Sequence, residues 1–227
     1  MSETGGRDPQ VEMQLHSVVD GLVNHTRGTF TRERLSAIVD ELYDEMSARA
    51  KVQTFVPVLV GRAALTQVRA EQVKAGEVLK SMPEVLIICQ ENAGRSQAAA
   101  ALIRYYAPGL LYVVSAGVAP VGHVLDEVTN RLAGQGVYLT DIPKKYSQEM
   151  LDIADHLIVV GAVDEDLTDA VEDVRRWDDI EQIEDVATSD VGGVLQQIDQ
   201  RVREALAEWL PDLDLGEPVM QRAPDPA

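Results

Sequence analysis

The chain has 227 residues, and 45% of them are hydrophobic, which is enough to bury a core in one large or two small domains. Its formal net charge is −18, which argues against non-specific binding to nucleic acid. There is no apolar run of transmembrane length, the first ten residues are polar, and there is one cysteine. We therefore expect a cytoplasmic protein with no membrane span, no intrachain disulfide and no bound metal.

The first third of the sequence predicts an all-α domain. Residues 1–10 are expected to form a disordered leader, and residues 11–80 a three-helix bundle. Apolar residues recur at helical spacing in three segments separated by short breaks: 11–25, 31–49 and 52–79. No chemical motif is visible here, because His16 and His25 have no partners at ligand spacing. A docking, dimerising or stabilising role is therefore expected, including a possible homodimer.

Residues 83–210 show a different pattern, in which strand and helix signals alternate. This alternation predicts a four-stranded parallel sheet with helices on both faces. The remaining residues, 211–227, contain four prolines and few apolar anchors, so we expect a disordered tail. The strands are expected at Val85–Ile88, Leu111–Ser115, His156–Val160 and Val174–Trp177.

One stretch places strand, loop and helix signals around the single cysteine. Apolar residues before Cys89 predict a buried strand, and the alanine-rich run after Ser96 predicts a helix. Between them lies Cys-x5-Arg, in which Asn92 and Gly94 can adopt positive φ. Such a loop directs backbone N–H groups and the helix dipole at one point, where a tetrahedral oxyanion can bind. We expect Arg95 to clamp that anion and Cys89 to act as a thiolate nucleophile.

The stretch 87–97 resembles the active-site loop of the low-molecular-weight protein tyrosine phosphatase superfamily. Its Asn-Ala-Gly-Arg-Ser-Gln sequence, residues 92–97, is more similar to the arsenate reductase branch than to the phosphatases, which usually have a second cysteine before the arginine. Residues 28–59 are similar to the three-helix domain that precedes some actinobacterial arsenate reductases. Weaker matches follow in order within residues 84–210: Ser115–Gly117, Pro143–Lys144, Asp155–Gly161 and Arg176–Trp177.

The resemblance implies a mechanism in which the cysteine attacks arsenate or a phosphate-like anion. Ser96 is placed to donate a hydrogen bond to the thiolate. The alternative for Cys89 is a small buried hydrophobic residue at a strand end. The residues expected to hold the oxyanion are Gln90, Glu91, Asn92, Ala93, Gly94 and Arg95.

The acid that protonates the leaving group is less well defined. Phosphatases of this superfamily use an Asp-Pro pair after the fourth strand, and this chain has no proline there. Asp178, Asp179 and Glu181 are the candidates. The resemblance favours Glu181, because alignment from Trp177 places it where single-cysteine arsenate transferases have an acidic residue before proline. The alternative is that these carboxylates only form an exposed acidic loop.

A single cysteine also leaves the chemistry incomplete. Thioredoxin-coupled relatives resolve the adduct with two further cysteines, and Ala162 lies where one of them would fall. An external low-molecular-weight thiol is therefore implied, as in the arsenate–mycothiol transferases, followed by a mycoredoxin or glutaredoxin-like protein. Lys144, Lys145 and His123 could lie near the pocket mouth, or could simply be solvated. Two other functions stay open: a phosphotyrosine phosphatase, and an oxyanion-binding interaction protein without turnover.

Overall fold

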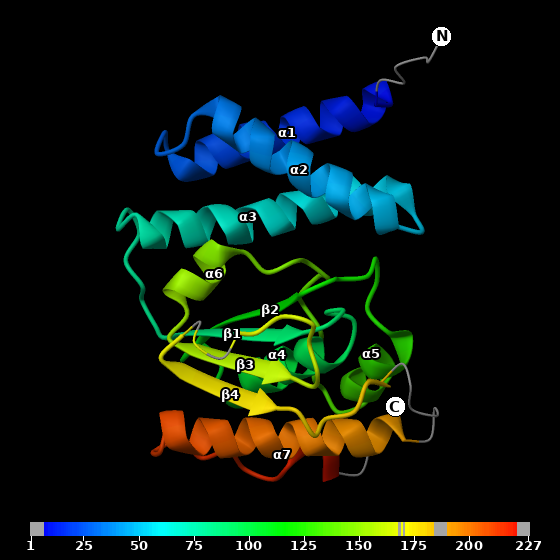
Figure 1. The fold of residues 1–227 in the computed structure, drawn as a ribbon, viewed down its shortest axis with the longest axis vertical. Coiled ribbons are helices and arrows are strands. Elements are labelled where there is room, and N and C mark those ends of the chain that lie inside the picture. The colour runs from blue at the N-terminus through cyan, green and yellow to red at the C-terminus, as the bar shows by residue number, and fades with distance from the viewer. Residues whose placement is uncertain (1–6, 168, 170, 184–189, 222–227) are drawn as a thin grey trace. The chain divides into compact units, whose positions relative to one another are not determined.

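The computed structural model describes residues 7–167, 169, 171–183 and 190–221. The chain divides into two compact units, residues 1–79 and 80–227. Figure 1 shows that the first consists of helices, and that the second is a sheet with helices against it. Within the described ranges, no helix has the length and apolar character needed to span a membrane.

The first unit contains three helices that pack on one another: α1 (Pro9–Thr26), α2 (Arg32–Arg49) and α3 (Val56–Lys74). A short 3-10 turn, η1 (Gln53–Phe55), precedes α3. The three helices share an apolar core, as their periodicity predicts. Its most buried side chains are Leu15, Val19, Leu22, Leu35, Ile38, Val39, Val56, Val60, Ala64 and Val68.

The beginning of α1 corrects one expected boundary. The disordered leader was expected to run to residue 10, but α1 begins at Pro9. The side chain of Asp8 accepts a hydrogen bond from the backbone N–H of Gln10, and proline is favoured in the first turn of a helix. The earlier part of the expected leader, residues 1–6, lies outside the described residues.

The second unit is built on a parallel sheet in the order β2-β1-β3-β4. Its strands are β1 (Glu84–Cys89), β2 (Tyr112–Gly117), β3 (His156–Val160) and β4 (Asp173–Trp177). All six residues of β1 are buried, because this strand lies inside the sheet and both of its faces are covered. The expected four-stranded parallel sheet is confirmed.

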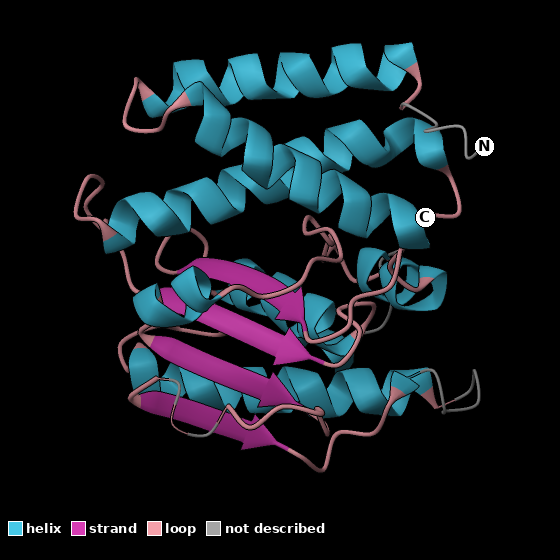
Figure 2. Cartoon of the chain, turned by 45° about the horizontal axis from the view of Figure 1, so that its top comes forward, coloured by secondary structure: helices cyan, strands magenta, loops and turns pink. Residues whose placement is uncertain are grey.

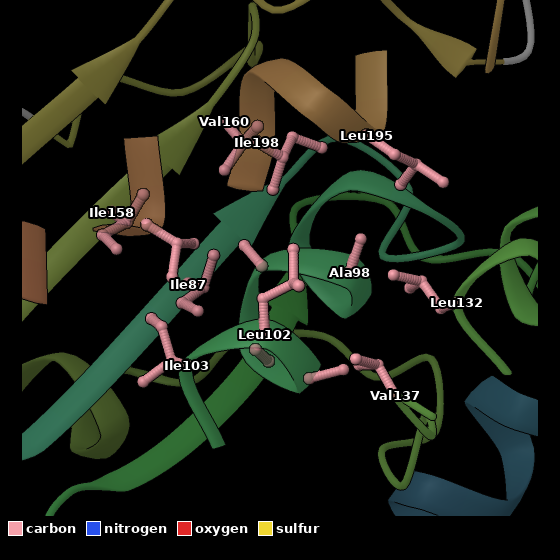
Figure 3. Packing of buried hydrophobic residues seen from close by; sticks show 14 of the residues in the cluster. Ile87, Ala98, Leu102, Ile103, Leu132, Val137, Ile158, Val160, Leu195 and Ile198 are labelled. Carbon is pink, nitrogen blue, oxygen red and sulfur yellow. The ribbon is translucent and has the colours of Figure 1, made fainter. Parts of the chain in front are cut away.

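Among the described residues, four α-helices accompany this sheet: α4 (Arg95–Tyr106), α5 (Asp126–Ala133), α6 (Gln148–Ile153) and α7 (Val191–Trp209). Helix α4 packs on β1, β2 and α7, whereas α6 lies on the other face (Figure 2). Figure 3 shows Ile87, Leu102 and Ile198, from β1, α4 and α7, meeting in the core between sheet and helices. Helices therefore cover both faces, as expected.

The segment after α7 differs from the expected disordered tail. Val219 is fully buried in the 3-10 turn η3 (Val219–Gln221), and its backbone N–H donates to the hydroxyl of Tyr106. The next amide, from Met220, donates to the carboxylate of Asp199. These polar bonds hold the segment together with Leu213, Leu215, Val219 and Met220, which pack against the core but are too scattered to give a periodic signal in the sequence. Residues 222–227 of the expected tail lie outside the described residues.

Candidate active site

Cys89 ends strand β1, and α4 begins at Arg95. Strand β1 lies between β2, which comes next in the chain, and β3, which follows after a crossover. The loop 90–94 therefore leaves the carboxyl edge of the sheet where the strand order switches direction. Ligands of open parallel sheets bind at this position.

Backbone hydrogen bonds hold the carbonyl groups of the loop on its outer side. Four of them accept bonds from the segment that follows β2, and the carbonyl of Asn92 accepts one from the side-chain amide of Gln97 at 3.2 Å. The loop is thus held mainly by backbone atoms, together with the buried side chain of Gln97. The four bonds run from Val118 to Cys89 (3.1 Å), Ala119 to Gln90 (2.8 Å), Val121 to Glu91 (3.0 Å) and Leu125 to Ala93 (2.9 Å).

The directions of these carbonyls determine where the loop amides point. All described peptide bonds are trans, and the C=O and N–H of a trans peptide point in opposite directions. The N–H groups of Gln90, Glu91, Asn92 and Gly94 therefore face away from the outer segment. The amide of Asn92 shows this directly, since it donates to the sulfur of Cys89 at 3.3 Å. This orientation is compatible with the expected inward-facing cradle of N–H groups.

The sulfur of Cys89 has a second polar neighbour. The hydroxyl oxygen of Ser96 lies 2.9 Å from it and also accepts a hydrogen bond from the side-chain amide of Asn92 at 2.8 Å. Because Asn92 is the donor in that bond, the Ser96 proton is available for the sulfur. Cys89 is 1% exposed, but Gln90 and Glu91 beside it are only half-buried, so the loop reaches the surface. The sulfur of Cys89 thus has two hydrogen-bonding partners within the loop and the first turn of α4.

Asn92 supports the loop from its centre. It adopts a φ of 51°, in the left-handed region, and its side-chain oxygen accepts a bond from the backbone N–H of Lys144 at 3.0 Å. Gly117 allows this close packing, because a Cβ there would lie 3.0 Å from the Asn92 backbone nitrogen. The loop conformation is therefore fixed by groups from three separate parts of the chain.

Arg95 begins α4 and is 3% exposed. Its Nη1 is buried and has no hydrogen-bond partner among the described residues. Gly161, directly after β3, provides the space: a Cβ there would lie 1.8 Å from Nη1. Burying an unpaired guanidinium nitrogen is costly, so Nη1 is a candidate donor to a bound anion.

The candidate proton donors lie on the segment after β4. The carboxylate of Asp179 accepts a bond from Arg201 of α7 at 2.7 Å, and that of Asp178 pairs with Arg176 at 3.0 Å. Glu181 is exposed. Its neighbours adjoin the loop: the carbonyl of Ile180 lies 2.9 Å from a Cβ built on Gly161, and the side chain of Ile183 lies 3.1 Å from one built on Gly94. The segment carrying Glu181 thus passes the cradle.

The basic residues differ from one another in their surroundings. Lys145 and His123 are exposed, whereas Lys144 is 5% exposed and is therefore not a solvated lysine. Its charge acts on Asp141, whose carboxylate also accepts bonds from Arg104 and from the Ser115 amide, both at 2.9 Å. Burial alone would raise the pKa of Asp141, but Lys144 and Arg104 lower it below its ordinary value. Lys144 is thus part of the support beneath the loop.

Two features of the site were not predicted. Gly161 was noted only within a segment that lacks a resolving cysteine, and its role under Arg95 depends on packing between distant segments. The side chain of Gln90 was expected only as part of the cradle, but it is bound to Asp164 in the loop after β3. Each contact joins residues more than sixty positions apart, and neither glycine nor glutamine is an informative signal by itself.

These parts define a class of protein: a parallel α/β sheet in which a strand ending in cysteine is joined to a helix beginning with a buried arginine by a loop at the carboxyl edge of the sheet. The family model described as low molecular weight phosphotyrosine protein phosphatase matches residues 84–213. The chain belongs to this family.

Solved structures agree with this assignment. A thioredoxin-dependent arsenate reductase from Corynebacterium glutamicum is 28% identical, with a TM-score of 0.75 over 86% of this chain and 95% of that chain. Residues 80–227 make up less than 86% of this chain, so the match extends into the helical unit. An arsenate reductase in a phosphate-binding state is 19% identical, with a TM-score of 0.50 over 56% of this chain and 98% of that chain, and it supports the fold alone. The family and the first match identify an enzyme of the arsenate reductase and phosphatase kind.

Proposed function

We propose that the protein is a thiol-dependent arsenate reductase in which Cys89 attacks bound arsenate. The observation that carries this proposal is the buried Nη1 of Arg95, which has no partner among the described residues and lies in the same site as the Cys89 sulfur and the Ser96 hydroxyl. A tetrahedral oxyanion satisfies that nitrogen and the loop amides together. The similarity to the thioredoxin-dependent arsenate reductase supports arsenate as the anion.

In the first step, the thiolate of Cys89 forms a sulfur–arsenic bond. One arsenic–oxygen bond breaks, and the oxygen leaves as water after taking up a proton. The loop amides and Arg95 stabilise the negative charge of the remaining oxygens. Glu181 is the proposed proton donor, with Asp179 as the alternative, because both are carboxylates of the segment that passes the loop.

The second step needs a thiol from outside the chain, because Cys89 is the single cysteine. We propose that a small thiol of the mycothiol class displaces Cys89 from arsenic, which regenerates the Cys89 thiolate and leaves arsenic(V) bound to the small thiol. A second thiol, from a mycoredoxin or glutaredoxin-like protein, then attacks the sulfur of this conjugate. A disulfide forms, the sulfur–arsenic bond breaks, and its electron pair reduces arsenic(V) to arsenite.

A second candidate is phosphotyrosine phosphatase activity through a phosphocysteine intermediate. The family match favours it, since the matched model carries that description. The absence of an Asp-Pro pair after β4 weighs against it, because an alkoxide is a poor leaving group without a well-placed acid.

The test supplies purified protein with arsenate and one thiol system at a time: mycothiol with mycoredoxin, glutathione with glutaredoxin, or thioredoxin with its reductase. Arsenite is measured, and release of an aryl alcohol from an aryl phosphate is measured separately. We expect arsenite only with a small-thiol system, and a loss of at least about a thousandfold in Cys89→Ser. A Cys89→Ser protein that keeps most of its arsenite production would refute the mechanism. Cysteine-dependent hydrolysis of the aryl phosphate without arsenite would select the phosphatase, and phosphate binding without either turnover would select the interaction protein.

A further inference from the structure

The side chain of Gln90 forms a closed pair of hydrogen bonds with a single residue, Asp164. Its Nε2 donates to the Asp164 carboxylate at 2.7 Å, and its Oε1 accepts from the Asp164 backbone N–H at 3.2 Å. The backbone carbonyl of Gln90 is also occupied, by the amide of Ala119 at 2.8 Å. The residue that directly follows Cys89 is therefore held at both its backbone and its side chain. We call the Gln90–Asp164 pair the clamp.

The clamp fastens a segment that has no regular structure of its own. The loop after β3 begins at Gly161, whose φ is +70°, and Leu167 is buried farther along it. Ala162, Asp164 and Glu165 between them are exposed. The side chain of Tyr146 contacts Glu165, which gives the loop a second tie. A loop of this kind has many accessible conformations, so each tie reduces its freedom measurably.

The beginning of this loop is the surface on which Arg95 rests. The guanidinium lies so close to Gly161 that even a Cβ would overlap with it, and its Nη1 has no partner in the described part of the chain. Packing against the loop backbone, and no hydrogen bond from the described residues, therefore positions that nitrogen. If the loop moves outward, the guanidinium can rotate away from the position in which it forms two bonds to an oxyanion.

We infer that Gln90 and Asp164 are positioning residues for Arg95, which act through the loop after β3. This inference rests on the proposed function, because it assigns a role within the same site. Since the clamp orders a group that binds the anion, its loss is expected to weaken oxyanion binding and raise the KM for arsenate. The sulfur of Cys89 has its own polar neighbours, Asn92 and Ser96, so kcat at saturating arsenate is expected to fall by a smaller factor than KM rises.

Geometry and charge make opposite predictions for Asp164. Its carboxylate is negative and exposed, so at close range it opposes binding of an anion. Asp164→Asn keeps a side-chain oxygen that can accept from Gln90, keeps the backbone bond and removes the charge. We expect Asp164→Asn to bind phosphate as tightly as the natural protein or more tightly. Asp164→Ala, which loses the side-chain bond, is expected to bind more weakly.

Exchanging the amide and the carboxylate of the clamp separates the effect of its hydrogen bonds from the effect of charge. Gln90→Glu places two carboxylates opposite each other and should break the clamp. Combining Gln90→Glu with Asp164→Asn gives a double variant with the same net charge as the natural pair. In it, the new amide at position 164 can donate to the new carboxylate at position 90, which also accepts from the backbone N–H. We therefore expect the double variant to recover most of the affinity that Gln90→Glu loses.

The experiment measures the dissociation constant of inorganic phosphate by calorimetry, together with KM and kcat for arsenate. Gln90→Ala and Asp164→Ala should weaken phosphate binding about three- to tenfold, and Gln90→Glu about tenfold or more, as expected for one or two hydrogen bonds. The double variant should lie within about threefold of the natural protein. The matched control is Gln200→Ala, which removes a similar exposed bond to Glu204 (2.9 Å) on α7 and should leave phosphate binding unchanged.

Three results would overturn the inference: unchanged phosphate affinity in Gln90→Ala, a loss in Asp164→Asn as large as in Asp164→Ala, or failure of the double variant to recover. A natural protein that binds no phosphate would overturn it as well. If phosphate binding depends on the clamp but arsenate is not turned over, the clamp stands and the proposed function fails. Phosphate binding measured without turnover therefore tests the clamp separately from the proposed function.

Discussion

The loop 89–95 and the segment 178–183 supply the two halves of the proposed chemistry, and they are held in different ways. In the loop, the six carbonyl groups of residues 89–94 have bonding partners, and the sulfur of Cys89 has two polar neighbours. In the segment, Ile180 and Ile183 are buried, but the three carboxylates belong to exposed residues. Asp178 and Asp179 pair with arginines near the surface, and Glu181 has no partner among the described residues. Backbone bonds thus fix the anion site, whereas the proton donor depends on exposed side chains.

This difference indicates which half of the chemistry is harder to change. Backbone hydrogen bonds survive most substitutions, so the cradle can be altered only where a glycine or a buried side chain is essential. A carboxylate on an exposed segment can be replaced by a neighbour two residues away at little cost to folding. The absence of the Asp-Pro pair at Trp177–Gln182 is consistent with this freedom.

The largest effect is expected from Gly161→Ala, which changes the surroundings of Arg95 in the anion site. The new Cβ would overlap with Nη1 of Arg95 and crowd the Ile180 carbonyl, so the guanidinium must move. We expect phosphate affinity to fall about a hundredfold or more, the magnitude typical of losing a bidentate charged contact. Calorimetric titration with phosphate measures this loss.

Gly136→Ala is the matched control for that substitution. Gly136 has nearly the same φ, +74°, but nothing lies within 4 Å of a Cβ built on it. Both variants should lose about 1 kcal/mol of unfolding free energy from left-handed strain, and Gly136→Ala alone should keep its phosphate affinity. Equal affinity in the two variants would show that Gly161 does not position Arg95.

The same contrast explains what could be predicted from sequence. Cys89, Arg95 and the beginning of α4 lie within one short stretch, so strand, loop and helix signals were enough to predict them. The contacts of Asn92 with Lys144 and of Gln90 with Asp164 join distant segments, and no local pattern encodes them. Likewise the segment 211–221 was expected to be disordered because of its prolines and few apolar residues, whereas its contacts with α4 and α7 join distant parts of the chain.

The far end of α4 offers the next largest effect. The hydroxyl of Tyr106 donates to Asp199 at 2.6 Å and accepts from the Val219 amide at 2.8 Å. Burial, together with the bond to Asp199, raises the pKa of Tyr106 to about 12. Folding therefore favours the neutral phenol, and the stability that depends on it is complete below pH 10 and is lost as the pH rises toward 12.

We expect this loss to be about 2–3 kcal/mol, since one pKa unit corresponds to roughly 1.4 kcal/mol. Tyr106→Phe cannot ionise, so it should be less stable than the natural protein at pH 8 and approach or exceed it near pH 12. Urea unfolding at several pH values measures the difference between the two proteins. A difference that stays constant from pH 8 to pH 12 would contradict the assignment.

Ser96→Ala should have a smaller effect, confined to the rate. Removing the hydroxyl takes away the group 2.9 Å from the sulfur of Cys89 and leaves the side-chain amide of Asn92 without that acceptor. We expect kcat for arsenate to fall about thirtyfold, as for loss of a bond to a charged group, and alkylation of the single cysteine by iodoacetamide to slow. Ser115→Ala is the control, because Ser115 is equally buried and its hydroxyl has no partner among the described residues. Similar losses in both variants would indicate a packing effect.

The smallest effects are expected in the exposed segment, where Glu181→Gln and Asp179→Asn test the ranking of the two proton donors. Asp179 is bound to Arg201, so its carboxylate is already engaged, and breaking that surface pair should cost under about 1 kcal/mol and lower kcat no more than about twofold. Glu181 lies between Ile180 and Ile183, which adjoin the cradle, and Glu181→Gln should lower kcat about tenfold. This is less than is typical of a buried general acid, since water can reach an exposed site and supply part of the proton transfer. Comparing the two kcat values, measured at saturating arsenate and thiol, ranks the two proton donors. A larger loss in Asp179→Asn would make Asp179 the proton donor. It would also mean that Arg201 holds the acid in place rather than occupying it.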